Sequence, residues 1–332
     1  MRVLVILPVY DQASPTGAFV TSREYVQHLA ARGHAVDVVT TIREPGDVRI
    51  EGRVRVWPLR YWRRAVQAAR PELFISHHGD RKARRIVSQV TSIPHLLMVH
   101  GMAGDRDLGR PSLVWFPSQA CRDHYPVYRG RALVLPPPIN PGLYRTTPGS
   151  MVTLNGSTTA KGADVLAAVA GELPDVQFLM VRAAGHVVDV QAPNVTVADR
   201  TDPRSVYART RVLLMPSTTE SYGRAGVEAM LSGIPVLAAP LQGIREALGA
   251  AATYIPRPDT ARWVGEIRRL SDPATYVAAS ARATARAGAL DYPGNLDEFE
   301  AACLSLRARQ AAGAGRPAAT PARGRVVKRG RG

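Results

Sequence analysis

Apolar runs and helical periodicity alternate along the first part of the chain. Residues 2–9, RVLVILPV, are continuously apolar, as expected of a strand that is covered on both faces of a sheet. Apolar positions then recur at helical spacing over 18–33, and Gly33 closes that segment. Residues 34–40, HAVDVVT, predict the next strand. The order strand, loop, helix, strand indicates a right-handed βαβ unit and a parallel sheet.

The same pattern continues and then starts again. Further strands of the first half are expected at 73–76, 95–100 and 132–136. The stretch 136–150, PPPINPGLYRTTPGS, breaks regular structure and indicates a linker. Beyond it we expect the following elements: strands at 151–156, 176–181, 195–198, 212–217 and 234–240, with helices from Gly162, over 205–211 and between Gly223 and Gly233. Two doubly wound α/β domains follow, with ligands at the carboxyl ends of their strands.

The domain boundaries follow from these breaks. We predict a first domain over 1–148 and a second over 149–292. A last helix over 293–308 is placed to pack back on the first domain. The basic stretch 309–332 has few large apolar residues, so we expect it to be disordered.

Composition narrows the class of protein. The chain of 332 residues carries a formal net charge of +16, which favours anionic partners: a nucleotide, an anionic membrane or nucleic acid. The two cysteines, Cys121 and Cys303, predict structural thiols in a reducing cytosol and argue against a disulfide framework or a zinc site. The first apolar run is too short and wrongly flanked for a signal peptide, and no stretch is long enough for a membrane span.

Two carboxylates stand out in the apolar stretch 216–240, PSTTESYGRAGVEAMLSGIPVLAAP. One interpretation is structural. Arg224 and Glu228 are four residues apart and could form a surface pair worth about 0.2–0.5 kcal/mol. Glu220 could complement a helix dipole for about 0.3–1 kcal/mol.

The second interpretation is a binding site. Between Gly223 and Gly233 the helix is almost entirely apolar, so a carboxylate at Glu228 needs a partner. The polar positions form one stripe that would face the cleft between the domains, where a carboxylate can accept hydrogen bonds from a ribose diol. The backbone N–H groups before the helix would add a site for an anion or a hydroxyl.

The segment 216–248 resembles the donor site of the retaining family 4 glycosyltransferases, which have the GT-B fold. The family's pattern of two glutamates eight positions apart is met by Glu220 and Glu228. The resemblance extends to 17–40, to LLMVHG at 96–101, and to KGADVLAAVA from Lys161, in the family's order. It covers about residues 1–290.

The resemblance implies a fold, an activity and a set of site residues. The fold would be α/β, with two Rossmann-like domains whose parallel sheets face across a cleft. The activity would be a metal-independent hexosyl transfer from a nucleotide-diphosphate sugar to a hydroxyl acceptor, with retention of configuration. No cofactor beyond the sugar nucleotide is expected. The alternatives are an epimerase or hydrolase on the same fold, or a non-catalytic protein that binds a nucleotide sugar or a polyanion.

The resemblance assigns roles to the residues that occupy the matching positions of the family's motifs. Glu220 would contact the transferred sugar, Lys161 would neutralise the diphosphate, and His100 would touch the sugar from the acceptor side. These are the predicted catalytic residues. The predicted donor-binding residues are Gly17, Ser157, Lys161, Arg182, Ser221, Tyr222, Gly223, Arg224 and Glu228, with no metal ligand. Within this set Glu228 would bind the ribose, and Gly17 would let the first loop approach the phosphates.

One stretch departs from the family. Members usually carry an arginine several residues before Lys161, and it contacts the diphosphate. Here NGSTTAKG places Ser157 in that position and shortens the loop by one residue. Arg182 or backbone N–H groups are the expected substitutes.

The region 59–85 is rich in arginine and includes Trp62. It is either a solvated face whose tryptophan packs inward, or a surface that docks on anionic lipid. The arginine-rich tail offers a second, weaker option, the binding of a nucleic acid. We expect a cytoplasmic protein, with peripheral attachment to the inner face of the membrane as the alternative.

Overall fold

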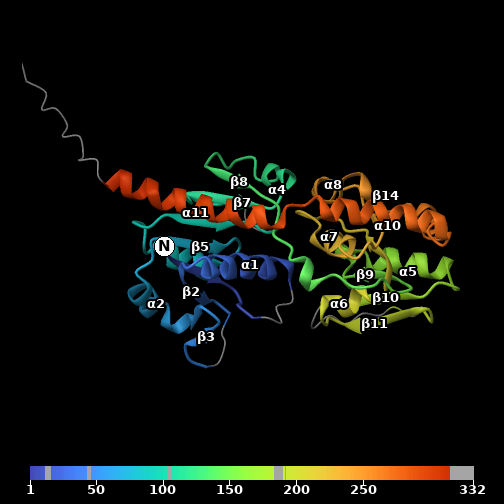
Figure 1. Ribbon diagram of the computed structural model, residues 1–332, viewed down its shortest axis with the longest axis horizontal. Helices are drawn as coiled ribbons and strands as arrows, with labels where there is room; N and C mark the ends of the chain where they lie inside the picture. Colours follow the sequence, from blue (N-terminus) through green and yellow to red (C-terminus); the bar gives the residue numbers. More distant parts are fainter. Residues whose placement is uncertain (12–15, 43–45, 103–105, 183–189, 191, 315–332) are drawn as a thin grey trace, which may run out of the picture.

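The computed structural model describes residues 1–11, 16–42, 46–102, 106–182, 190 and 192–314. These residues form two α/β domains, each with its own sheet, joined by a linker (Figure 1). The first sheet has eight strands in the order β3-β4-β2-β1-β5-β6-β7-β8, and the second has six in the order β11-β10-β9-β12-β13-β14. All pairings are parallel except that of β3 with β4. The expectation of two parallel-sheet domains is confirmed.

The first sheet is built from short, buried strands. Their bounds are β1 (Arg2–Leu7), β2 (Ala35–Thr40), β3 (Arg49–Glu51), β4 (Val54–Pro58), β5 (Leu73–His77), β6 (His95–Met98), β7 (Leu113–Phe116) and β8 (Ala132–Val134). The helices of this domain are α1 (Gly17–Ala31), α2 (Trp62–Ala69), α3 (Arg81–Ser88) and α4 (Gln119–Asp123). Strand β1 packs Val3 and Val5 toward α1 and packs Leu4 and Ile6 toward α2 and α3. Because successive side chains of a strand point to opposite faces, a run that is covered on both faces must be apolar throughout.

The second sheet follows the linker. Its strands are β9 (Met151–Asn155), β10 (Phe178–Arg182), β11 (Val195–Asp199), β12 (Thr210–Met215), β13 (Val236–Ala238) and β14 (Thr253–Tyr254). The helices are α5 (Ala163–Glu172), α6 (Pro203–Tyr207), α7 (Arg224–Met230), α8 (Gln242–Leu248), α9 (Thr260–Arg269) and α10 (Pro273–Gly288). One face packs on α5 and α9, and the other on α7, α8 and α10.

The last helix, α11 (Tyr292–Ala314), lies along the first domain (Figure 1). Its residues Phe299 and Cys303 are fully buried in the same core as β1 and α1. The Phe299 ring stacks on Tyr25 of α1 with a centroid distance of 3.8 Å. Glu300 accepts hydrogen bonds from Arg32 and from His34 at 3.0 and 2.9 Å. The chain therefore crosses from the second domain back to the first.

Two sequence expectations about helices are wrong in detail. The predicted helix over 205–211 ends at Tyr207, because Thr210 already pairs with Met151 and opens β12. The last helix continues to Ala314 rather than ending at 308, since the sequence after Arg309 is alanine-rich and alanine is the best helix former. The first six residues of the predicted disordered tail are thus helical, and 315–332 lie outside the described residues.

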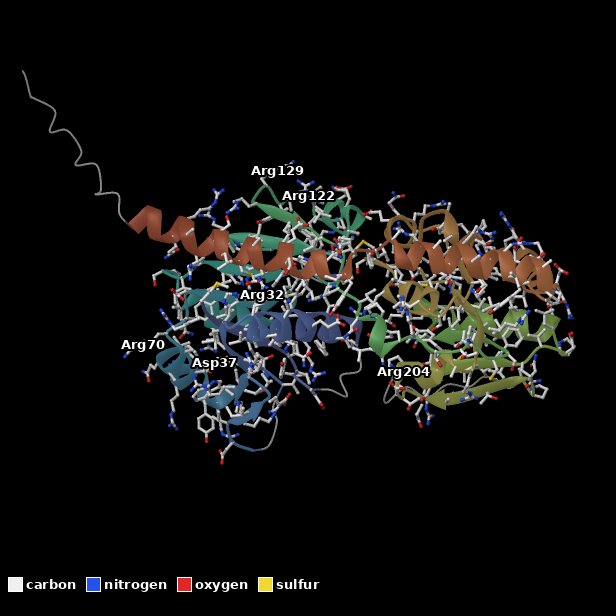
Figure 2. All side chains as sticks on the ribbon, viewed as in Figure 1. Arg32, Asp37, Arg70, Arg122, Arg129 and Arg204 are labelled. Carbon is white, nitrogen blue, oxygen red and sulfur yellow. The ribbon has the colours of Figure 1, made fainter. Side chains whose placement is uncertain are left out.

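Exposed arginines are spread over both domains. Figure 2 labels Arg70 after α2, Arg122 in α4, Arg129 before β8 and Arg204 in α6, and all four are exposed. The positive charge is therefore not confined to one element. No helix among the described residues has the length and apolar character needed to cross a membrane.

Candidate active site

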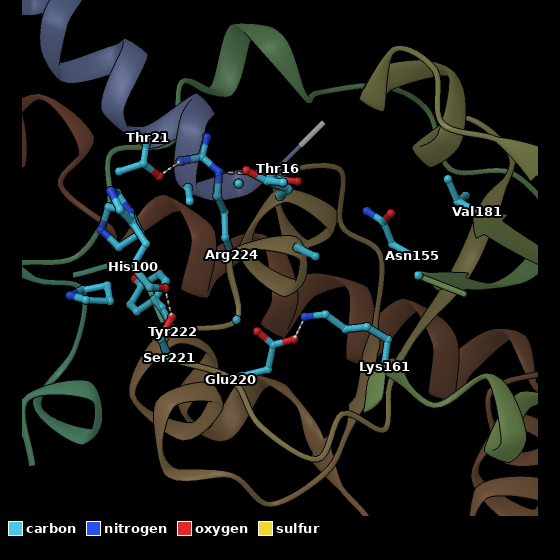
Figure 3. A pocket seen from close by; sticks show the side chains of 18 of the residues that line it. Thr16, Thr21, His100, Asn155, Lys161, Val181, Glu220, Ser221, Tyr222 and Arg224 are labelled. Carbon is cyan, nitrogen blue, oxygen red and sulfur yellow. Dashed lines mark hydrogen bonds and ion pairs between the residues drawn. The ribbon is translucent and has the colours of Figure 1, made fainter. Parts of the chain in front are cut away.

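The first acid of the site, Glu220, lies in the loop after β12, next to the loop after β9. The two strands are parallel neighbours, so their carboxyl ends lie side by side. The backbone N–H of Thr218 donates to the carbonyl oxygen of Ala160 at 2.9 Å and fastens the loops together. The Lys161 ammonium donates to Oε1 of Glu220 (Figure 3). Two residues 59 positions apart in the sequence thus meet at the carboxyl ends of these two strands.

Glu220 is held in place but remains accessible. Its Oε1 also accepts a hydrogen bond from the Ser217 hydroxyl at 3.0 Å. The side chain of Glu220 is 15% exposed and that of Lys161 is 45% exposed. An ion pair this open adds at most about 1 kcal/mol to stability. The small contribution of the Lys161–Glu220 ion pair to folding stability therefore does not explain its presence.

Glu228 lies in α7 and has two protein partners. Nε of Arg224 donates to its Oε1 at 2.7 Å, and the Tyr207 hydroxyl donates to its Oε2 at 2.9 Å. Burial, together with the Glu228 carboxylate, raises the pKa of Tyr207 well above its ordinary value, so the hydroxyl keeps its proton. The side chains of Arg224 and Glu228 are only about one-tenth exposed. The interpretation of these two residues as a surface pair is therefore wrong.

Arg224 connects the second domain to the rest of the molecule. Its guanidinium also binds groups of α1 and of the linker: the Thr21 hydroxyl at 3.0 Å, the Glu24 carboxylate at 3.2 Å, the Pro138 carbonyl at 2.7 Å and the Tyr144 hydroxyl at 2.9 Å. Arg224 was predicted to bind the donor. In the structure the N–H groups of Arg224 donate hydrogen bonds to protein groups of both domains. The spacing of these residues along the chain could not reveal this.

The first domain meets the second at its own strand ends. The Ser221 hydroxyl donates to the carbonyl oxygen of His100 at 2.7 Å, across the boundary between the domains. Nε2 of His100 lies 3.1 Å from the Ser22 hydroxyl. Burial, followed by the nearby His77 and Arg224, lowers the pKa of His100 well below its ordinary value. His100 is therefore a neutral imidazole at neutral pH.

These residues surround a cavity of about 420 Å³ between the domains. Every predicted site residue lines it: Gly17, His100, Ser157, Lys161, Arg182, Glu220, Ser221, Tyr222, Gly223, Arg224 and Glu228. The structure thus brings them together, while their roles stay predictions.

Sequence reasoning missed other lining residues. They include Thr16, Thr21, Trp115, Pro117, Pro137, Asn155, Thr158 and Arg200. Thr16 caps α1 by accepting from the N–H of Phe19, and a threonine just before a helical pattern is a signal that could have identified it. Trp115 lies in β7 and Pro117 directly follows it, and the pattern did not predict this strand.

Two arginines at the second sheet, Arg182 and Arg200, differ in whether their guanidinium groups are already paired. Arg182, the expected substitute for the missing arginine, donates to both oxygens of Asp199, at 2.5 and 3.1 Å. Arg200 lines the same cavity and is exposed. It makes no hydrogen bond or ion pair with any other residue in the described ranges. Arg182 is thus held by Asp199, whereas the described structure leaves the Arg200 guanidinium at the cavity without such a partner.

A cleft between the carboxyl ends of two doubly wound sheets, with a C-terminal helix that crosses back to the first domain, is the GT-B architecture of glycosyltransferases. The chain has this fold: sucrose-phosphate synthase from Thermosynechococcus elongatus superimposes with a TM-score of 0.80 at 16% identity, covering 93% of this chain and 100% of that one. HepE from Anabaena, solved with UDP and glucose, superimposes with a TM-score of 0.72 at 18% identity, covering 92% and 100%.

Sequence comparison matches part of the chain. Residues 152–272 match the family described as Glycosyl transferases group 1. A D-inositol 3-phosphate glycosyltransferase of Nocardia farcinica (strain IFM 10152) is 33% identical over 134 residues, which is 38% of this chain. The match spans 30% of that relative's length.

Proposed function

We propose that this protein is a retaining glycosyltransferase of family 4. It moves a sugar from a nucleotide-diphosphate donor to a hydroxyl acceptor. The observation that carries the proposal is the Lys161–Glu220 pair, which lines the cleft together with His100 and Gly17 of the other domain. The Glycosyl transferases group 1 match over 152–272 includes both members of the pair.

The charges fit the cleavage of a sugar–diphosphate bond. Breaking that bond builds negative charge on the leaving phosphate and positive charge on the anomeric carbon. Lys161 and Arg200 would stabilise the phosphate, and groups already oriented for the developing charge are the strongest lever available to an enzyme. Glu220 would exchange Lys161 for a sugar hydroxyl when donor binds. The acceptor would attack from the face that the phosphate leaves, with the phosphate taking its proton.

The remaining residues would orient the donor. Glu228 would accept hydrogen bonds from the ribose, with Tyr207 and Arg224 holding its carboxylate. His100, being neutral, would hydrogen bond to a sugar hydroxyl rather than supply charge. HepE was solved with UDP-glucose, so uridine diphosphate sugars are the first donors to test. We propose that side-chain cations make a metal unnecessary.

The test is a donor screen that measures released nucleoside diphosphate, with UDP-glucose first and a panel of hydroxyl acceptors. Glu220→Ala and Lys161→Met should each lower turnover by at least about 100-fold. Glu172→Ala is the matched control, because this exposed glutamate lies at the end of α5 and does not line the cleft. Addition of a chelator should leave turnover unchanged.

The outcomes separate the alternatives. Turnover that needs no acceptor and yields free sugar or an epimer identifies a hydrolase or an epimerase. UDP-glucose binding without any turnover identifies a binding protein. An inverted anomeric configuration in the product, read by NMR coupling constants, would refute retention.

We further propose a cytoplasmic location with peripheral contact to anionic lipid through 59–85. Arg60 and Arg63 of this region are exposed, and Trp62 is half-buried against the core. The Arg63 guanidinium lies over the Trp62 ring at 4.6 Å. Sedimentation with liposomes that contain or lack anionic lipid tests this contact, and equal recovery would end it. Nucleic acid, as the weaker alternative, would show as retention on heparin and DNA that is lost in salt.

A further inference from the structure

A second cavity, of about 640 Å³, lies in the first domain under α3. One wall is α3 with the turn to Ile93, and the other is the segment 107–112. The connection from β6 to β7 has no helix in its described residues, 99–102 and 106–112. The sheet face at β6 is therefore left without the helix that usually covers a parallel crossover. We call this cavity the α3 groove.

The interior of the α3 groove is mostly apolar. Its apolar lining residues are Val87, Val90, Ile93, Leu97, Leu108 and Pro111. On the floor the Ser76 hydroxyl and Nε2 of His95 lie 2.8 Å apart. Burial lowers the pKa of His95 to about 4, so this imidazole is neutral at neutral pH. Such an interior fits the apolar body of a small molecule.

The mouth of the groove is positive. Arg81, Arg84 and Arg110 line it together with two acids, Asp80 and Asp107. Both acids are already engaged. Asp80 caps α3 by accepting from two backbone N–H groups, and Asp107 accepts from Arg84 at 2.8 Å. Within the part of the chain that the structure describes, neither Arg81 nor Arg110 has an ion-pair partner. The three arginines and two aspartates of the mouth leave a net charge of +1, and an anion there would meet two guanidinium groups that hold no ion pair with the described residues.

One end of the groove adjoins the active-site cleft. His77 lines the groove, and its ring stacks on His100, which lines the cleft, with a centroid distance of 4.7 Å. Nδ1 of His77 lies 2.7 Å from the carbonyl oxygen of His78, but Nε2 is buried and has no partner among the described groups. A buried polar atom without a partner is costly, and a ligand hydroxyl could satisfy it.

We propose that the α3 groove binds the acceptor, and that the acceptor is an amphiphilic alcohol with an aryl or alkyl body and an anionic group. The body lies between α3 and 107–112, the anion lies at Arg81 and Arg110, and the hydroxyl end lies at His77, on the side of the groove next to the cleft. The proposal rests on the proposed function, because it names the acceptor of that reaction.

The binding test needs no catalysis. The probe is 8-anilinonaphthalene-1-sulfonate, an aromatic anion whose fluorescence rises in an apolar site. The double variant Arg81→Gln/Arg110→Gln should raise its Kd at least about tenfold, and Val87→Trp, which fills the groove, should abolish the groove signal. Arg85→Gln is the matched control, since Arg85 is exposed on the same helix but does not line the groove. Circular dichroism checks that each variant is folded.

Displacement of the probe by other ligands shows where it binds and which chemical groups the groove prefers. The compound 4-(hydroxymethyl)phenyl phosphate should displace the probe, and the neutral 4-methylbenzyl alcohol should do so at least about tenfold more weakly. UDP should leave the probe bound. Displacement by UDP, equal displacement by the two alcohols, or an equal effect of Arg85→Gln would each overturn the proposal.

The same two alcohols separate this proposal from the proposed function. With UDP-glucose as donor, 4-(hydroxymethyl)phenyl phosphate should have an acceptor KM at least about tenfold below that of 4-methylbenzyl alcohol. The double variant Arg81→Gln/Arg110→Gln should remove this difference in KM and leave the affinity for UDP unchanged. Transfer with no change of acceptor KM in the variant would refute the groove and leave the function standing. UDP-glucose turnover that yields only free sugar or an epimer, with these alcohols and with the whole acceptor panel, would refute the proposed function, and with it the assignment of the groove to an acceptor.

Discussion

Several buried carboxylates of this protein are held by polar or charged partners. Glu228 is held by Arg224 and Tyr207. Asp37, also buried and labelled in Figure 2, accepts from Arg55 at 2.5 Å and from the indole N–H of Trp57 at 2.6 Å. An isolated buried charge would be far more costly than any such pair. The sequence shows the acid but not its partner, because Tyr207 and Glu228 are 21 positions apart.

His95 gives a prediction at this scale, a loss of stability in mild acid. Its folded pKa of about 4 lies below the ordinary value of 6.5, so between these values the unfolded chain binds the extra proton. The free energy of unfolding should fall as the pH drops from 6.5 to 4, with up to about 3 kcal/mol of the loss due to His95. Denaturant titrations across this range measure it. His95→Gln should show a smaller drop, and an identical drop would refute the assignment.

Elements of the second domain are joined by turns that only certain residues permit. Gly162 ends the loop of Lys161 with a φ of 102°, in the left-handed region. A Cβ there would lie 2.2 Å from Cγ of Pro216, in the loop that follows β12. The glycine therefore allows the two loops to touch, and it is this contact that brings Lys161 to Glu220. The sequence predicted a helix from Gly162 but not the contact.

Gly162→Ala should consequently damage both stability and the site. We expect a loss of about 2 kcal/mol or more in the free energy of unfolding, from the unfavourable φ and the clash, together with weaker UDP binding by calorimetry. Gly171→Ala is the control, because Gly171 lies within α5 with no atom near its added Cβ. That substitution should stabilise by roughly 0.5–1 kcal/mol. Equal effects of the two changes would refute the role of the loop contact.

At the scale of the whole molecule, a few polar contacts tie the domains together around the cleft. Arg224 binds α1 and the linker, and the Glu246 carboxylate accepts from the backbone N–H groups of Gln119 and Ala120 at the start of α4, both at 2.7 Å. Together with the packing of α11 on the first domain, these contacts set the width of the cleft.

Removal of Arg224 tests this connection. Arg224→Met leaves Glu24 and Glu228 buried without their cation, so it should cost about 3–5 kcal/mol of unfolding free energy. Adding Glu24→Gln should recover part of that loss, which a double-mutant cycle measures. Small-angle scattering should also show a larger radius of gyration for Arg224→Met. The control is Arg129→Met, an exposed arginine of the first domain (Figure 2), which should change neither quantity. Additive effects of Arg224→Met and Glu24→Gln would refute the coupling.

The sequence by itself determined the elements that local patterning controls. Continuous apolar runs marked β1 and β9, helical spacing marked α1 and α5, and the prolines of 136–150 marked the linker, because strand burial, helix periodicity and proline geometry act over a few residues. The paired glutamates also marked one side of the cleft. Short strands such as β7 carried too little pattern to be recognised.

Only the tertiary structure decided which distant residues meet. It showed that Arg224 holds the domains together, that Arg182 is paired to Asp199 while Arg200 faces the cavity, and that a groove lies under α3. Each of these depends on strand order, on the packing of helices on a sheet, or on the packing of one domain against the other. Contacts of that kind join residues tens to hundreds of positions apart, and no spacing along the chain encodes them.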